Sequence, residues 1–187
     1  MKFDYQLSGI GWAEVEIEIN NQNTYCNPSY ISEPLIDLIN GLVSITPGCI
    51  ADDELKDEVT FEWNEEPGGD IWYLKRVNNK DLMVKIISYS DLFNKDQSTV
   101  RVNMDTICDL EEFIRSVVIA SGSLLKKHGF VGYRKTWCRH DFPISGYLIL
   151  KKYIESKKVY PVTNIFFRGN YDLVSSDLED EFKTLFE

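Results

Sequence analysis

The pattern that most constrains the fold is an alternation of acidic and apolar side chains along residues 12–19. Glu14, Glu16 and Glu18 alternate with small or β-branched apolar residues. A period of two residues is that of a β-strand, whose successive side chains point to opposite faces of a sheet. Carboxylates on one face repel one another unless water, a cation or a basic partner lies above them. The pattern therefore predicts a sheet with one buried face and one acidic face that is hydrated or faces a partner.

The rest of the chain divides into strand-like and helix-like segments. Strands are predicted at residues 2–7, 12–19, 24–26, 59–63, 71–77, 82–87 and 98–104, and residues 159–167 are also β-prone. Helices are predicted at residues 35–43, 110–128 and 142–157 and from Ser176 onward. Ser32 is expected to cap the first helix, and Thr106 with Asp109 to form a capping box before the second. Gly129 is expected to end that second helix.

Tight turns separate most of the predicted strands, and they predict the fold class. The segment of residues 65–70 contains Pro-Gly, and residues 78–80 contain Asn-Asn, both of which are typical of hairpins. Hairpins imply antiparallel pairing, because parallel strands need long crossover connections. We therefore expect a single α+β domain over residues 1–187, with an antiparallel sheet and helices packed on one face.

The charge distribution excludes some classes of partner. The chain of 187 residues has a net charge of −10; residues 1–97 hold 18 acids and 7 bases, and residues 98–187 hold 12 acids and 13 bases. Phosphate would be repelled by most of such a surface, so we expect no nucleic-acid partner. The basic segment of residues 115–158 is interpreted as solvated helix faces, with pairing to the acidic C-terminal stretch as the alternative.

Composition also bears on location. No stretch approaches the roughly 18–20 apolar residues of a membrane span, and the N-terminus does not have the pattern of a signal peptide. The four cysteines are widely spaced and form no C-x-x-C pair, which favours reduced thiols. We therefore expect a cytoplasmic protein with no membrane partner.

The sequence offers little for catalysis. Cys138, His140 and Asp141 gather three ligand types, but structural zinc needs a second pair of ligands and none is present, so we expect no metal and no cofactor. The same three residues are the ones to inspect if the chain is an enzyme. Glu62 and its neighbours are placed at an exposed hairpin tip, where nothing would separate their pKa values for acid–base work. No catalytic residue is predicted.

Aromatic residues lie beside the acidic ones. Trp12 falls on the same side of its strand as the glutamates, while Trp63 and Trp72 flank the turn of residues 65–70. Such residues either fill the core or, ringed by charge, anchor a protein interface. The predicted partner-binding set is Trp12, Glu14, Glu16, Glu18, Glu62, Glu65, Glu66 and Trp72.

Residues 11–13, 28–38, 61–68 and 72–74 carry a resemblance to known proteins. They contain a strand, a helix that opens with Ser-x-x-Leu and a Trp-x-Glu-Glu-Pro-Gly hairpin, and over this first half the chain resembles a group of small bacterial proteins of uncharacterised function. That resemblance carries over no catalytic residues. In size, acidity and fold class the chain is also similar to bacterial immunity proteins, the small acidic antidotes of secreted toxins.

Three hypotheses follow. The first is a non-enzymatic binding protein, an immunity protein that neutralises a basic toxin by occlusion. The second is a small enzyme or ligand-binding domain with a pocket between sheet and helices. The third is a structural or assembly protein that uses its terminal helix from Ser176 as an interface. The sequence specifies no oligomeric state.

Overall fold

The computed structural model describes residues 1–92, 100–166 and 172–186, and it confirms the α+β class. The strands of the first sheet, in the order β1-β2-β3, are β1 (Lys2–Gly9), β2 (Trp12–Ile19) and β3 (Gln22–Cys26). The strands of the second sheet, in the order β4-β5-β6-β7, are β4 (Glu58–Asn64), β5 (Gly69–Arg76), β6 (Asp81–Tyr89) and β7 (Arg101–Asp109). Neighbouring strands in both sheets are antiparallel, as the hairpin turns predict.

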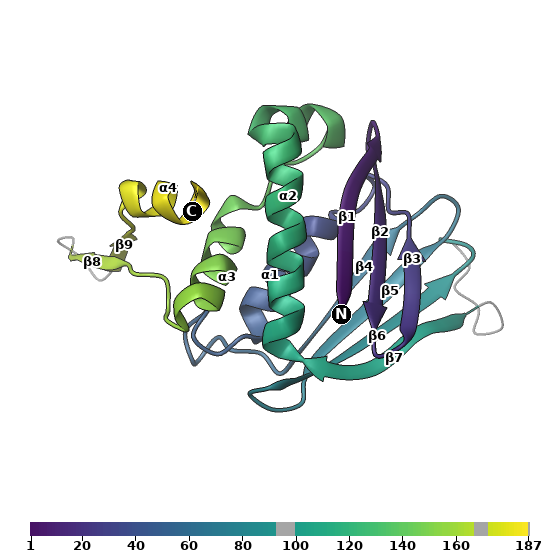
Figure 1. The fold of residues 1–187 in the computed structure, drawn as a ribbon, viewed down its shortest axis with the longest axis horizontal. Coiled ribbons are helices and arrows are strands. Elements are labelled where there is room, and N and C mark those ends of the chain that lie inside the picture. The colour runs from purple at the N-terminus through teal and green to yellow at the C-terminus, as the bar shows by residue number, and fades with distance from the viewer. Residues whose placement is uncertain (93–99, 167–171, 187) are drawn as a thin grey trace.

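Four helices and a hairpin complete the described part of the chain. The helices are α1 (Pro34–Ile45), α2 (Leu110–Trp137), α3 (Ile144–Ser156) and α4 (Leu178–Phe186), and the hairpin pairs β8 (Thr163–Phe166) with β9 (Asp172–Ser175). In Figure 1 the two sheets lie on one side of the molecule and the helices on the other, with α2 packed against β1 and α1 against β4. The β8–β9 hairpin and α4 lie at the end farthest from the sheets.

Apolar side chains from both sheets and from α1, α2 and α3 form one continuous core. At its centre lies an aromatic cluster in which the rings of Trp63 and Trp72 are 4.3 Å apart, and Tyr5 meets Trp63 edge-on. Trp72 is 0% exposed, so its prediction as a partner-binding anchor is wrong. The physical reason is its position: β5 is an interior strand, and Trp72 and Leu74 point into the core from it.

Side chains join the two sheets along a seam between β3 and β7. The Gln22 side chain accepts a hydrogen bond from the Asp105 backbone N–H at 3.0 Å and donates to the Asp105 carbonyl at 3.1 Å. Asn20, in the β2–β3 turn, donates to the Ile107 carbonyl at 2.7 Å. These amides take the place of a backbone ladder, so β3 lies beside β7 without pairing to it.

The first helix does not begin as predicted. Glu33, and not Ser32, is the N-cap residue of α1, and its side chain makes no capping hydrogen bond. The Ser32 hydroxyl is used elsewhere, because it accepts a hydrogen bond from the Asn64 backbone N–H at 2.8 Å. Ser32 therefore links the start of α1 to the end of β4.

The second helix also departs from prediction at both ends. Thr106 lies within β7 opposite Val84, and Asp109 alone caps the helix by accepting a hydrogen bond from the Glu112 backbone N–H. Gly129 does not end the helix but kinks it, at φ 62° and ψ 174°, and the helix resumes as far as Trp137. The start of the strand predicted at residues 98–104 and the last residue of the segment 159–167 lie outside the described residues.

Within the part of the chain that the structure describes, no helix has the length and apolar character needed to span a membrane.

Candidate functional site

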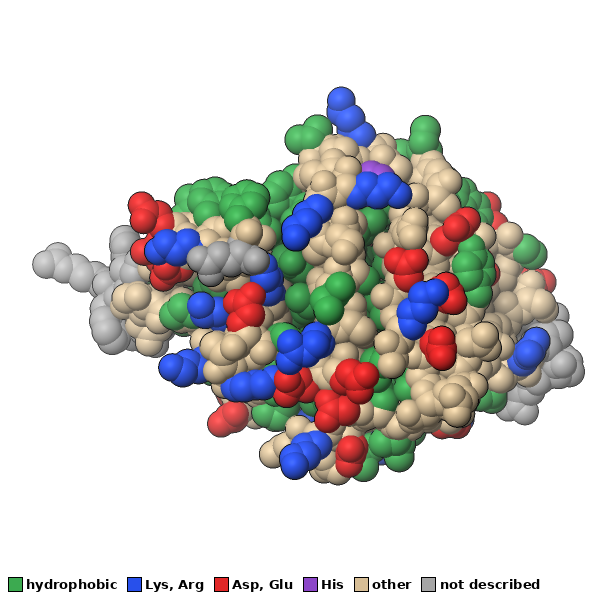
Figure 2. Space-filling model, in the orientation of Figure 1, with side chains coloured by type: hydrophobic (Ala, Val, Ile, Leu, Met, Phe, Trp, Pro, Cys, Tyr) green, Lys and Arg blue, Asp and Glu red, His purple; other side chains and the backbone are tan. Residues whose placement is uncertain are grey.

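The outer face of the first sheet is the candidate site. Glu14, Glu16 and Glu18 are exposed along β2, while the residues between them are buried, as the alternation predicts. The register with β1 sets Asp4 opposite Glu16, which adds a fourth carboxylate to the same face. Figure 2 shows these acidic side chains gathered over β1–β3, with a basic side chain among them. We call this surface, made of Asp4, Glu14, Glu16 and Glu18, the acidic face.

Lys2 partly neutralises the acidic face. Its Nζ lies 2.6 Å from Glu16 Oε2, at the solvent-exposed end of β1. The hydrogen bond to Glu16, together with the negative charge of Asp4 and the other nearby carboxylates, raises the pKa of Lys2. Within the described residues neither Glu14 nor Glu18 has an ion-pair partner, so the face keeps a net negative charge.

Tyr25 supplies an aromatic side chain that sequence analysis missed. It lies on β3 opposite Glu16, and it is 56% exposed. Partial desolvation and the negative charges of Glu14 and Glu65 raise the pKa of Tyr25, and its hydroxyl hydrogen-bonds Glu14. The signal was present in the sequence, because Tyr25 occupies an outward position of a strand whose neighbours Thr24 and Cys26 are buried. Trp12, also on the acidic face, is half-buried at the start of β2.

The three predicted acids of the second sheet, Glu62, Glu65 and Glu66, differ in their exposure to solvent. Glu62 and Glu66 are exposed on β4 and the turn that follows it. Glu65 turns inward, where its carboxylate accepts a hydrogen bond from the Asn27 backbone N–H. The expectation that Glu65 stands at an exposed hairpin tip is therefore wrong, because the turn folds back onto the end of β3.

Glu65 and the buried Asp70 form a hydrogen-bonded acid pair. Burial is the main cause that raises the pKa of both carboxyls, and the hydrogen bond between them raises the pKa of Glu65 further while it opposes the rise for Asp70. Asp70 also accepts a hydrogen bond from the Ser88 hydroxyl at 2.5 Å and another from the Cys26 thiol. Burial is also the main cause that raises the pKa of Cys26.

A proton-sharing acid pair can serve acid–base catalysis, but the partners of this pair give it a structural role. Asp70 is 3% exposed, and its partners come from β3, β6 and the β4–β5 turn. Asn103 on β7 extends the network by donating to the Ser88 hydroxyl. The network therefore fixes the turn and the end of β3, and with them Tyr25, at the edge of the acidic face.

The structure gives Cys138, His140 and Asp141 three separate partners. The Cys138 thiol donates to the Lys135 carbonyl at 3.4 Å, and Asp141 lies 3.8 Å from Arg134. His140 Nε2 lies 3.2 Å from a carboxylate oxygen of Glu33. Glu33 also accepts a hydrogen bond from Trp137 Nε1 at 3.1 Å.

These contacts tie the end of α2 to the start of α1 and assemble no Cys–His pair. Among the described residues, no group of three or more His, Cys, Asp or Glu side chains is arranged to hold a metal ion.

Most lysines of the basic segment of residues 115–158 are exposed on or next to helices α2 and α3, as predicted, and two of its basic residues pair with Glu111 at the start of α2. Lys157 Nζ lies 2.5 Å from Glu111, and Arg115 lies 2.7 Å from the same carboxylate. Among the described side chains, no ion pair joins residues 115–158 to residues 173–186. In Figure 2, Lys and Arg side chains accordingly gather over α2 and α3, away from the acidic face.

Comparison with protein-family models, with curated proteins and with solved structures found no match for this chain. The resemblance to small bacterial proteins and to immunity proteins therefore stays a prediction, and the site is argued from its own geometry.

Proposed function

We propose that this chain is a non-enzymatic binding protein that occludes a basic protein partner, in the manner of an immunity protein bound to a toxin. The observation that supports the proposal is the exposure of Glu14 and Glu18, which have no ion-pair partner within the described residues, beside the exposed ring of Tyr25. Holding like charges on one strand costs free energy, and a basic partner would recover it.

Acidic and aromatic residues would contribute to binding in different ways. The acidic face would attract a basic partner over a distance, which raises the association rate and makes it depend on salt. Tyr25 and the half-buried Trp12 would supply apolar contact, since aromatic residues surrounded by polar ones are typical hot spots. Glu62 and Glu66 would extend the acidic rim from the second sheet.

We also propose a cytoplasmic location. All four cysteines are free thiols, three of them buried. Free thiols are the usual state in a reducing compartment.

The test compares two variants that change net charge equally. The first replaces Glu14, Glu16 and Glu18 by glutamine. The control replaces the exposed acids Asp52, Asp53 and Glu54 by their amides, in a loop between α1 and β4. Each variant and the wild type is used as bait in a lysate of the native host, and the captured protein is purified for kinetics. We expect a basic protein that wild type and control retain and the first variant loses.

Association kinetics with that purified protein then test the mechanism. Removing the three carboxylates should lower the association rate constant by about tenfold at low salt and flatten its salt dependence. Tyr25→Ala should instead raise the dissociation rate by about thirtyfold, as expected for an anchor. Equal loss of rate in the control variant, or unchanged kinetics in the first variant, would show that the acidic face is not the binding surface.

A further inference from the structure

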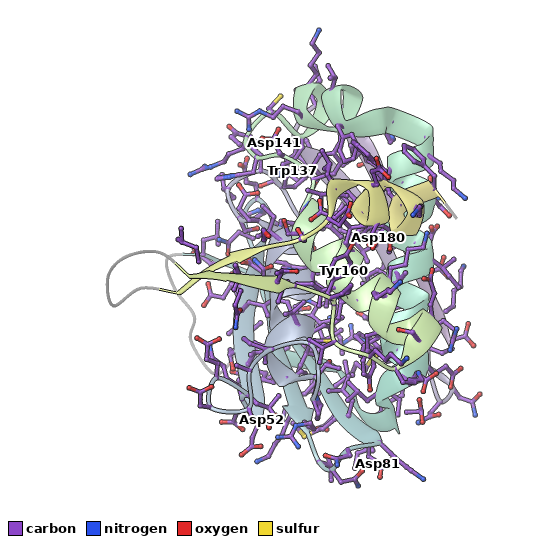
Figure 3. All side chains as sticks on the ribbon, turned by 90° about the vertical axis from the view of Figure 1, so that its left-hand side faces the viewer. Asp52, Asp81, Trp137, Asp141, Tyr160 and Asp180 are labelled. Atoms are coloured by element: carbon purple, nitrogen blue, oxygen red, sulfur yellow. The ribbon has the colours of Figure 1, made fainter. Side chains whose placement is uncertain are left out.

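The inner side of helix α4 is docked on the rest of the molecule. Thr184 is buried, and Leu185 packs against the core. Tyr160, in the segment that follows α3, lies beside Thr184. Figure 3, in which α4 faces the viewer, shows the helix lying over the outside of α3 with Tyr160 labelled nearby. The position of α4 is therefore fixed by one side of the helix.

Beside this docked surface, α4 carries an apolar stripe that the described part of the chain leaves exposed. Leu178, Phe182 and Phe186 are spaced four residues apart and are 61%, 50% and 77% exposed. The rings of Phe182 and Phe186 stack with their centroids 6.3 Å apart. Figure 2 shows hydrophobic side chains gathered over this helix. Contiguous exposed apolar surface of this kind marks an interaction site.

The stripe continues into a groove between α4 and α2. The groove has a volume of about 530 Å³, and Phe186 forms part of its lining together with Ile119 and Phe130 of α2. Ile119 and Phe130 are themselves exposed. The apolar surface thus extends beyond α4, which matters because a specific interface buries at least about 1,200 Å² in total.

We infer that a second copy of this chain covers the stripe, with the two α4 helices packed antiparallel about a two-fold axis at Phe182. The spacing supports this arrangement. Because Leu178 and Phe186 are equidistant from Phe182, an antiparallel pair centred there sets Leu178 of each copy against Phe186 of the other and the two Phe182 rings against each other. A two-fold interface must be self-complementary in this way.

The charges beside the stripe are self-complementary too. Glu179 and Lys183 border Phe182 and Phe186 on the outer surface of α4. In the antiparallel arrangement, Glu179 of one copy and Lys183 of the other are offset by only about 3 Å along the helix axis, from a rise of 1.5 Å per residue. Lys183 Nζ lies 3.1 Å from Asp180 of its own helix, and the two-fold axis adds two equivalent contacts between Lys183 of one copy and Glu179 of the other.

The first test measures the oligomeric state of the full chain by sedimentation equilibrium. We expect a dimer at micromolar concentrations, and Phe182→Glu should raise the dimer dissociation constant by about thirtyfold or more. Val102→Glu is the control, because Val102 is 52% exposed on β7, far from α4. Circular dichroism checks that both variants remain folded. A wild-type chain that stays monomeric at all concentrations overturns the inference.

The second test separates contacts between copies from effects within one helix. Glu179→Lys and Lys183→Glu each place like charges at positions 179 and 183 on the two sides of the axis. The homodimer of each variant should therefore dissociate into monomers. An equimolar mixture should recover the dimer, because only the mixed pair brings opposite charges together, while the charges within each helix are unchanged. Failure of the mixture to recover would contradict the antiparallel arrangement.

The third test locates the axis. Phe182→Cys is made in a Cys138→Ser background, since Cys138 is the exposed native thiol. Mild oxidation should convert the variant to a disulfide-linked dimer, because the two positions face each other. Val102→Cys in the same background should not cross-link. The inference is independent of the acidic face, which lies at the other end of the molecule (Figure 1). The two proposals can therefore fail separately.

Discussion

Asp37 illustrates how one residue responds to its surroundings. It lies half-buried in the first turn of α1, close to Glu33. Burial and the negative charge of Glu33 raise the pKa of Asp37 to about 6, against a hydrogen bond from the Glu33 backbone that lowers it. The native state therefore binds this proton more tightly than the unfolded chain does. The contribution of Asp37 to the free energy of unfolding is therefore fully present below the pKa of the unfolded chain, and it is lost as pH rises through about 6.

Asp37→Asn should therefore stabilise the protein at pH 7.5 and have little effect below pH 4. We expect a gain of about 1 kcal/mol, discounted from the full shift because the side chain is only half-buried. Urea unfolding at several pH values measures the difference in free energy of unfolding between the variant and the wild type. Asp52→Asn, at an exposed site, controls for the loss of a charge. A variant less stable than wild type at pH 7.5 would mean that the helix N-terminus favours the carboxylate more than burial opposes it.

Residues whose role depends on distant parts of the chain were the ones that sequence analysis misjudged. The outward direction of Glu14, Glu16 and Glu18 follows from the strand period alone. The inward direction of Glu65 does not, because its partners Asn27 and Asp70 are brought together only by packing of the two sheets. Local pattern indicates which residues share a strand face, but it does not indicate which face the rest of the molecule covers.

The helices and strands likewise divide into those that local sequence predicts and those that depend on packing. The bounds of β2 match the prediction, since eight residues of strict alternation leave one interpretation. Thr106 was assigned to a helix cap, but pairing of β7 with β6 extends the strand through it. Gly129 has the left-handed backbone expected of a helix stop, yet the chain re-enters a helix after one residue. In both places pairing or packing of the element outweighs a local signal.

The kink in α2 gives a prediction with an internal control. Gly129 has φ 62°, whereas Gly132, three residues later, is in the regular part of the helix. A side chain would meet open space at Gly129 and only the Cβ of His128, at 3.8 Å, at Gly132.

Gly129→Ala should thus cost about 1 kcal/mol through backbone strain, while Gly132→Ala should gain about 0.5–1 kcal/mol. Thermal and urea unfolding of both variants measure the difference. Equal effects at the two positions would mean that the kink straightens at little cost.

At the scale of the whole molecule, the chain separates its charges. The acidic face lies on the first sheet, basic side chains gather over α2 and α3, and the apolar stripe lies beyond them on α4 (Figures 1 and 2). Net charge along the sequence indicates two halves of different sign, but only the fold shows that the acidic face and the basic side chains of α2 and α3 lie on different sides (Figure 2). If a basic partner binds as proposed, that placement keeps the basic side chains of α2 and α3 away from the acidic face, where Lys2 is already paired with Glu16.

The seam between β3 and β7 holds the first sheet, which carries the acidic face, against the second sheet. The contribution of the seam can be tested. Gln22→Ala removes both hydrogen bonds to Asp105 and should cost about 1 kcal/mol, because the bonds are exposed to solvent. The Asp105 amide should then exchange its hydrogen at least tenfold faster, whereas the Val84 amide, within the interior strand β6, should not change.

Gln6→Ala is the matched control, since its amide bonds the Asp4 side chain on the acidic face and touches no seam backbone. Hydrogen exchange followed by mass spectrometry or NMR reports both amides in the same sample. If Asp105 stays protected in Gln22→Ala, packing between β3 and β7 and the Asn20 hydrogen bond to Ile107 hold the sheets together without Gln22. The acidic face would then owe its orientation to those contacts and not to the Gln22 side chain.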